Sequence, residues 1–114
     1  MKGTVWYYIY EDGIKQLRQI QANYECLKIK TVRERFSRFD SFIEFDNGDI
    51  WRLALGRDSS RGNKINVSYI DRRIEEEVVR CIIKPCTVAY PFQAFRYYGP
   101  YPKEEEVKYK WNIS

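Results

Sequence analysis

The feature that most constrains the fold of this chain is the tetrapeptide Asp46-Asn47-Gly48-Asp49, which lies between two apolar runs. Asn-Gly accepts the positive φ angles that a two-residue type I′ turn requires at both central positions. Residues 41–45 and 50–55 are therefore expected to form a β-hairpin, and the fold must contain a sheet that includes it.

Further segments have the composition of strands. Residues 5–10 (VWYYIY) are β-branched and aromatic on both faces, which is typical of a strand buried on both sides. Residues 65–70 (INVSYI) form another apolar run, which ends at Asp71. Residues 107–113 alternate between apolar and polar side chains, which predicts a strand with one wet face. Two shorter segments also fit strands: 24–30 and 86–90.

Two segments have the periodicity of amphipathic helices. A break at Glu11-Asp12-Gly13 is followed by apolar residues at helical spacing, which predicts a short helix over about residues 13–22. Residues 72–83 have a second helical pattern, and Pro85 is expected to stop it.

The remaining segments are connections. Residues 31–39 fit a strand and a helix face equally well, whereas 56–64 and 91–102 are expected to be loops. Strands interrupted by two helices predict one small domain over residues 1–114, of the α/β or α+β class. Its sheet is expected to be mixed or antiparallel, with about five or six strands.

Residue counts exclude several kinds of chemistry. The absence of histidine removes Ser-His-Asp and Cys-His catalysis and every His-containing metal site. Three thiolates, from Cys26, Cys81 and Cys86, cannot complete a four-ligand zinc shell. We therefore predict no metal and no cofactor. The odd count predicts reduced thiols and a cytoplasmic location, with a Cys81–Cys86 disulfide as the alternative and Cys81 buried in its helix. No apolar run approaches the ~20 residues of a membrane span.

Basic residues are concentrated in two segments, 28–38 and 57–64. Over the whole chain the excess is small, with 20 Lys and Arg against 16 Asp and Glu. Cations beside the rings of Phe36 and Phe39 could bind phosphates and bases, or the rings could belong to the core below a solvated face. The second segment could bind a phosphate or be an ordinary solvated loop. The candidate anion or nucleic-acid residues are Lys28, Lys30, Arg33, Arg35, Arg38, Arg57, Arg61 and Lys64.

The segment 91–102 (PFQAFRYYGPYP) has the composition of a recognition surface. Tyr offers a large contact area at a small entropic cost, and Arg and Tyr are frequent hot spots. The alternative is a loop packed over the sheet. The candidate partner-binding residues are Arg96, Tyr97, Tyr98 and Tyr101.

Asp71 allows two interpretations. An acid at the end of an apolar strand can hold a magnesium ion beside a nucleotide, since strand ends face the ligand crevice of open α/β sheets. Aspartate is also a favoured N-cap, and the next predicted helix follows directly.

The order of elements resembles the ATPase core of phage terminase large subunits. The matching residues are Asn47-Gly48, Arg61-Gly62 and the run INVSYID up to Asp71, about a third of the chain. The resemblance implies a nucleotide-binding scaffold of phage or mobile-element origin. The chain departs from the pattern because it has no Gly-x-x-x-x-Gly-Lys-Ser/Thr phosphate loop and has Arg72 where a second acid is expected.

These features predict a small non-enzymatic binding protein that engages a host protein, a nucleic acid or a nucleotide through its basic and Tyr/Arg-rich surface. Two alternatives stay open: a sequence-tolerant nucleic-acid-binding module, and a degenerate nucleotide-binding protein that uses Asp71. No nucleophile–base pair can be assembled, which argues against an enzyme. An edge strand at 107–113 would allow a homodimer.

Overall fold

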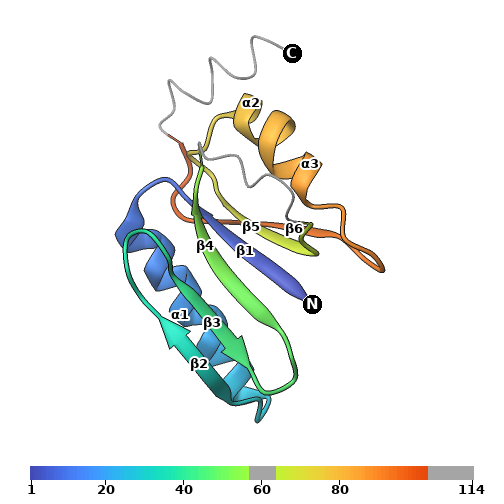
Figure 1. Ribbon diagram of the computed structural model, residues 1–114. Helices are drawn as coiled ribbons and strands as arrows, with labels where there is room; N and C mark the ends of the chain where they lie inside the picture. Colours follow the sequence, from blue (N-terminus) through green and yellow to red (C-terminus); the bar gives the residue numbers. More distant parts are fainter. Residues whose placement is uncertain (57–63, 103–114) are drawn as a thin grey trace.

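The protein is described by a computed structural model that covers residues 1–56 and 64–102 (Figure 1). It is an α+β domain with a six-stranded mixed sheet in the order β2-β3-β4-β1-β5-β6, as the sequence predicts. The strands are β1 (Lys2–Tyr7), β2 (Thr31–Arg35), β3 (Phe42–Phe45), β4 (Ile50–Leu55), β5 (Val67–Asp71) and β6 (Ala94–Tyr98).

Strand β1 is the centre of the sheet. It pairs in parallel with β4 on one side and with β5 on the other, and β5 pairs in parallel with β6. The burial of Val5 and Trp6, which point to opposite faces and are both 0% exposed, confirms the predicted two-sided burial. The predicted strand was too long, because the chain turns into a helix at Tyr10.

Helix α1 (Tyr10–Cys26) is longer than the predicted helix at both ends. Glu11-Asp12-Gly13 does not break the chain but forms the first turn. A Cβ on Gly13 would lie 2.6 Å from Tyr7 Cβ, so the glycine lets the helix pack close to the sheet. The strand predicted over 24–30 was wrong: the helix continues to Cys26, and the chain turns after it at Lys28, whose φ is 66°.

The hairpin of β3 and β4 confirms the main prediction from the sequence, but the turn type differs. The Gly48 N–H donates to the Phe45 carbonyl (3.0 Å), and the Phe45 N–H donates to the Asp49 carbonyl (2.9 Å). Gly48 has a φ of 92°, whereas Asn47 does not have a positive φ. The connection is therefore a three-residue loop with glycine in the left-handed position, and not a type I′ turn.

The second helical segment runs through α2 (Glu76–Val78), the π-helical turn η1 (Val79–Ile83) and α3 (Lys84–Cys86). Pro85 does not stop it, because the Lys84 N–H still bonds to the Val79 carbonyl in the wider π turn that precedes the proline. Cys81, expected to be buried, is an exposed free thiol, so the Cys81–Cys86 disulfide is not formed.

The C-terminal segments differ most from prediction. Residues 86–90 are not a strand, and the predicted loop over 91–102 contains the edge strand β6. The predicted strand over 107–113 lies outside the described residues, so the homodimer that depends on it stays a prediction. No helix in the described part of the chain has the length and apolar character needed to cross a membrane.

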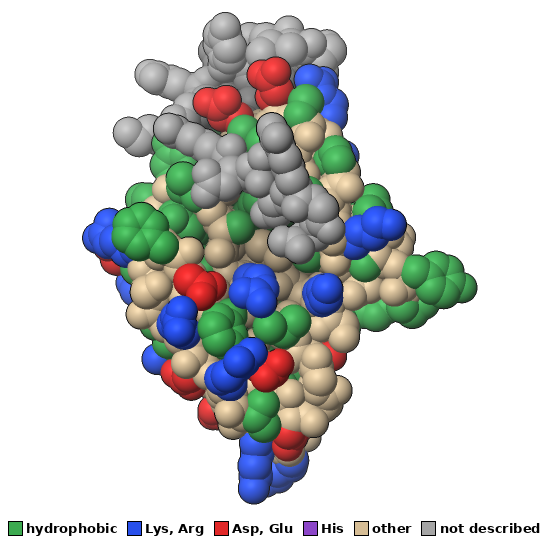
Figure 2. Space-filling model, in the orientation of Figure 1, with side chains coloured by type: hydrophobic (Ala, Val, Ile, Leu, Met, Phe, Trp, Pro, Cys, Tyr) green, Lys and Arg blue, Asp and Glu red, His purple; other side chains and the backbone are tan. Residues whose placement is uncertain are grey.

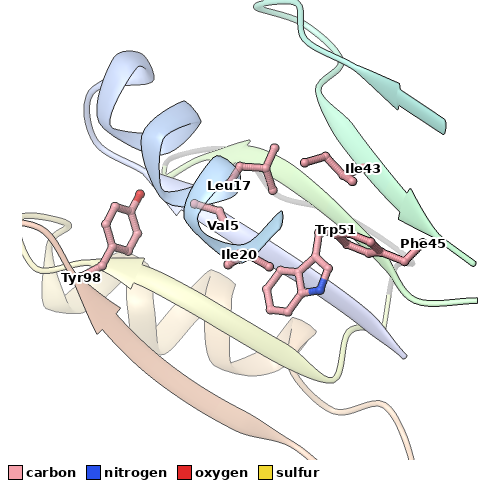
Figure 3. Packing of buried hydrophobic residues seen from close by; sticks show 7 residues of the cluster. All are labelled: Val5, Leu17, Ile20, Ile43, Phe45, Trp51 and Tyr98. Carbon is pink, nitrogen blue, oxygen red and sulfur yellow. The ribbon is translucent and has the colours of Figure 1, made fainter. Parts of the chain in front are cut away.

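Two hydrophobic clusters lie on opposite faces of the sheet. Helix α1 covers the first, which joins Val5, Leu17, Ile43 and Trp51 (Figure 3). The helical segment 76–86 covers the second, which includes Trp6 and Ile83. On this second face, no described helix covers β2, β3 and β4 (Figure 1). We call this uncovered region the open face, and it presents the side chains of Arg33, Arg35, Phe42, Glu44 and Arg52.

Candidate binding surface at the carboxyl edge of the sheet

The carboxyl ends of the four parallel strands lie along one edge of the sheet, which we call the carboxyl edge. The chain leaves β1 into α1 on one face and leaves β5 into the helical segment 76–86 on the other face. Adjacent parallel strands whose connections leave in opposite directions form the switch point at which open α/β sheets bind ligands. This topology makes the carboxyl edge the expected position of a functional site.

An ion-pair network occupies the switch point. Both oxygens of Asp71, a side chain with 0% exposure, accept hydrogen bonds from the Arg73 guanidinium (Nε to Oδ1 2.9 Å, Nη2 to Oδ2 2.6 Å). Arg73 Nη2 also donates to Asp12 Oδ2 at 2.7 Å. These hydrogen bonds, with Asp71 first, raise the pKa of Arg73 above its ordinary value. The bond to Asp12 therefore links the end of β5 to the start of α1, while the bidentate pair with Asp71 holds the guanidinium in place.

This network argues against both interpretations of Asp71, as a helix cap and as a metal ligand. Asp71 is not an N-cap, because the helix begins at Glu76 after Glu75, and its Oδ1 accepts instead from the Arg73 backbone N–H (2.9 Å). With both oxygens engaged by Arg73, the carboxylate is poorly placed to bind magnesium. Among the described residues, no three His, Cys, Asp or Glu side chains are grouped as a metal site.

The predicted partner-binding residues separate into core and surface. Tyr98 is 8% exposed and its hydroxyl donates to the Trp6 carbonyl (2.9 Å), so it belongs to the core and is not available to a partner. Burial raises the pKa of Tyr98. Tyr97 and Tyr101 are 51% and 78% exposed, and Arg96 is also exposed but lies on the opposite face of β6 from Tyr97.

Arginine–aromatic pairs follow the carboxyl edge. The Arg38 guanidinium carbon lies 5.4 Å from the centre of the Tyr10 ring, and that of Arg73 lies 5.3 Å from the Tyr8 ring. Beyond β5, Arg72 lies 4.6 Å from the Tyr101 ring and donates to the Gly99 carbonyl. Cations within about 6 Å of a ring centre are held there by its quadrupole.

Two clefts open at this edge. One of about 580 Å³ is lined by Tyr10, Arg38 and Phe39 and by the end of β4. The other, of about 490 Å³, is lined by Tyr8, Gly56 and the start of the helical segment 76–86. Phe39 was expected either to stack on bases or to lie in the core. It is 99% exposed, which excludes a place in the core, whereas Phe36 packs against the α1 cluster.

The predicted anion-binding residues do not form one patch. Lys28 and Lys30 lie beside the β3–β4 turn at the opposite edge, as shown by the hydrogen bond from the Asp46 N–H to the Lys30 carbonyl. Arg33 and Arg35 lie on the open face, and Arg38 on the carboxyl edge. Lys64 is exposed before β5, and Arg57 and Arg61 lie outside the described residues.

Sequence reasoning missed several members of the edge: Tyr8, Tyr10, Asp12, Arg72 and Arg73. All of them follow directly after β1 or β5. The rule that the carboxyl ends of parallel strands share an edge could have found them, had the strand directions been known.

Comparison with known proteins adds no relative: no family model, curated protein or solved structure matches this chain. The resemblance to phage terminases therefore stays a prediction.

Proposed function

We propose that this protein is a non-enzymatic binding protein whose carboxyl edge docks onto a partner protein. The observation that carries the proposal is Phe39. It is 99% exposed and lies at the rim of the 580 Å³ cleft, between the charged residues Arg38 and Asp40. Aromatic rings are enriched in protein interfaces, so an exposed ring beside a concave surface has the position of an interface anchor.

The charge of this edge favours a protein over a polyanion. Arg38 faces Glu11 at 3.9 Å, Arg73 is neutralised by Asp71 and Asp12, and Glu75 lines the second cleft. Carboxylates distributed among the arginines repel phosphates but suit a partner surface of mixed charge. Aromatic and Arg side chains at the centre of a patch are also the composition of protein interfaces.

The same geometry argues for binding without turnover. A catalytic or metal-binding acid must present its oxygens to a ligand, and at the switch point both oxygens of Asp71 accept from Arg73. The first turn of α1 holds Glu11 and Asp12, whose charges oppose a phosphate at that helix end. These contacts make the degenerate nucleotide-binding alternative the weaker one.

The origin and location belong to the same proposal. A phage or other mobile-element protein acting on a host protein would work in the cytoplasm. Cys26 and Cys81 are exposed free thiols, which a reducing compartment protects from cross-linking.

The test is quantitative capture from a nuclease-treated bacterial lysate by the wild type, Phe39→Ser and a matched control, Tyr90→Ser. Tyr90 is 92% exposed and precedes β6 at the opposite edge of the sheet. We expect Phe39→Ser to lose at least about tenfold of the specific capture, because hot-spot rings contribute about 2 kcal/mol or more. Tyr90→Ser should behave as the wild type. Equal losses in the two variants, or capture that disappears with nuclease, would contradict the proposal.

A further inference from the structure

A β-bulge at Val32 decides which way β2 presents its arginines. Thr31 faces α1, where its hydroxyl accepts a hydrogen bond from Gln21 (2.8 Å). In a regular strand Arg33 would face the same side. The register shifts between Thr31 and Arg33, so that Arg33 pairs with Glu44 on the open face. Bulges are a common means of re-aiming a side chain near a functional surface.

The bulge brings three guanidinium groups together. Arg33 and Arg52 lie 5.0 Å and 5.5 Å from the centre of the Phe42 ring. Arg35 and Arg52 both reach Asp40, at 3.1 Å and 3.7 Å. The arginine side chains are 52–63% exposed, so each guanidinium is fixed by a ring or a carboxylate and still faces solvent.

The open face has an excess of positive charge. Next to Arg52 lies a shallow hollow of about 230 Å³, lined also by the exposed Lys2 and by Thr4. Four cations therefore meet two carboxylates, Asp40 and Glu44. Figure 2 shows Lys and Arg side chains gathered over β2–β4, with fewer acids between them. The exposed ion pairs are weak and can be exchanged for stronger contacts to phosphate.

We propose that the open face binds the phosphate backbone of double-stranded DNA without reading its sequence. Planar guanidinium groups fit phosphate oxygens in a bidentate manner. The Phe42 ring is 9% exposed and lies beneath the arginines, so it offers no platform on which unpaired bases could stack. The proposal does not depend on the partner protein at the carboxyl edge, because the open-face arginines are not part of that surface.

The dimensions of the face set the expected salt dependence. From β2 to β1 the sheet spans three strand spacings, about 14 Å, along which duplex DNA carries about eight phosphate charges. Four cations that each neutralise one phosphate give a log–log slope of about −3.6. Affinity should then fall about 100-fold between 50 and 200 mM NaCl.

The experiment is fluorescence anisotropy with a labelled 20-base-pair duplex of arbitrary sequence, titrated with the full chain at several NaCl concentrations. The test variant is Arg33→Gln/Arg35→Gln/Arg52→Gln. The control, Lys15→Gln/Arg80→Gln/Lys84→Gln, makes the same change in net charge at exposed positions on the helices. We expect the test variant to retain only about a threefold salt effect between 50 and 200 mM NaCl and the control to keep the wild-type slope.

A second variant makes the test independent of loss of folding. Asp40→Asn/Glu44→Gln removes the competing carboxylates and should tighten binding. Three results would overturn the proposal: no duplex binding at 20 mM NaCl, equal slopes in the test and control variants, or stronger competition by a single strand of equal length than by the duplex.

Discussion

Arginine–carboxylate pairs in this molecule occur both in a buried network and on an exposed surface. At the carboxyl edge, the Arg73 side chain is 18% exposed and lies 2.6 Å from the fully buried carboxylate of Asp71. On the open face, Arg33, Arg35 and Arg52 are 52–63% exposed and lie 3.1–3.7 Å from half-exposed acids.

The degree of burial determines whether an arginine–carboxylate pair stabilises the fold or remains available to a ligand. Removing one partner of a buried pair leaves an uncompensated charge away from water, which is strongly destabilising. Removing one partner of an exposed pair costs little, because water replaces it. Arg73 therefore links the end of β5 to the start of α1 at the switch point, whereas the open-face arginines are free to exchange their acids for a ligand.

The largest expected effect is that of Asp71→Asn. The substitution keeps the shape of the side chain but leaves Arg73 with Asp12 as its ionic partner. We expect a loss of about 3 kcal/mol in the free energy of unfolding, measured by urea denaturation. Asp40→Asn, the matched change on the open face, should stay within about 0.5 kcal/mol. Equal losses in the free energy of unfolding of the two variants would contradict the difference between the buried and the exposed pairs.

Glycine substitutions test the backbone around the buried network. Gly99 has a φ of 83°, and a Cβ there would lie 3.3 Å from Asp71 Oδ2. Gly48 has a φ of 92° with no atom within 4 Å of its Cβ position. The left-handed conformation costs an L-residue about 1–2 kcal/mol, so Gly48→Ala should lose about that amount in thermal unfolding. Gly99→Ala should lose more, and a smaller loss would contradict the tight packing on Asp71.

A polar network without arginine gives an intermediate effect. The Tyr24 hydroxyl donates to Asp49 Oδ2 (2.7 Å) and accepts from Trp51 Nε1 (2.9 Å). Burial, with a further contribution from Asp49, raises the pKa of Tyr24 from 10.0 to about 12. The folded state therefore binds this proton more tightly than the unfolded state, so the stabilisation is complete below pH 10.0 and is lost as the pH rises to about 12.

The measurement is urea unfolding of the wild type and Tyr24→Phe at a series of pH values. At neutral pH the variant should be less stable by about 1 kcal/mol, because Trp51 loses a hydrogen-bond partner. Between pH 10 and 12 it should lose less stability than the wild type. Parallel curves over that interval would show that Tyr24 does not contribute to the alkaline transition.

The smallest effect is expected for Arg35→Ala on the open face. Its pair with Asp40 is exposed on both sides, so the free energy of unfolding should change by less than about 0.5 kcal/mol. A loss above about 1 kcal/mol in urea denaturation would show that the open-face arginines are structural after all.

The sequence predicted the central strands and the hairpin because their signals are local. Val5 and Trp6 lie in a run that is apolar on both faces, and Asn47-Gly48 marks a turn whatever its exact type. The class of the fold followed from the order of these elements.

The errors have physical causes that lie outside any short window. Gly13 was taken for a breaker, but its missing Cβ is what admits α1 to the sheet. The bulge at Val32 reverses the side on which Arg33 points, which period-two alternation cannot reveal. Tyr98 belongs to a parallel strand whose partner, β5, is 27 residues away at Asp71, so its burial depends on tertiary pairing.

The parallel pairing of β1 has a consequence for how the protein is made. Its neighbours are distant in the chain: Lys2 pairs with Ile50, and Gly3 pairs with Val67. Ribosomes add about 5–20 residues per second, so β1 leaves the exit tunnel about 3–13 s before β5 does. Until β4 follows, β1 has neither of its strand neighbours, and α1 is the first element that can cover its Val5 face.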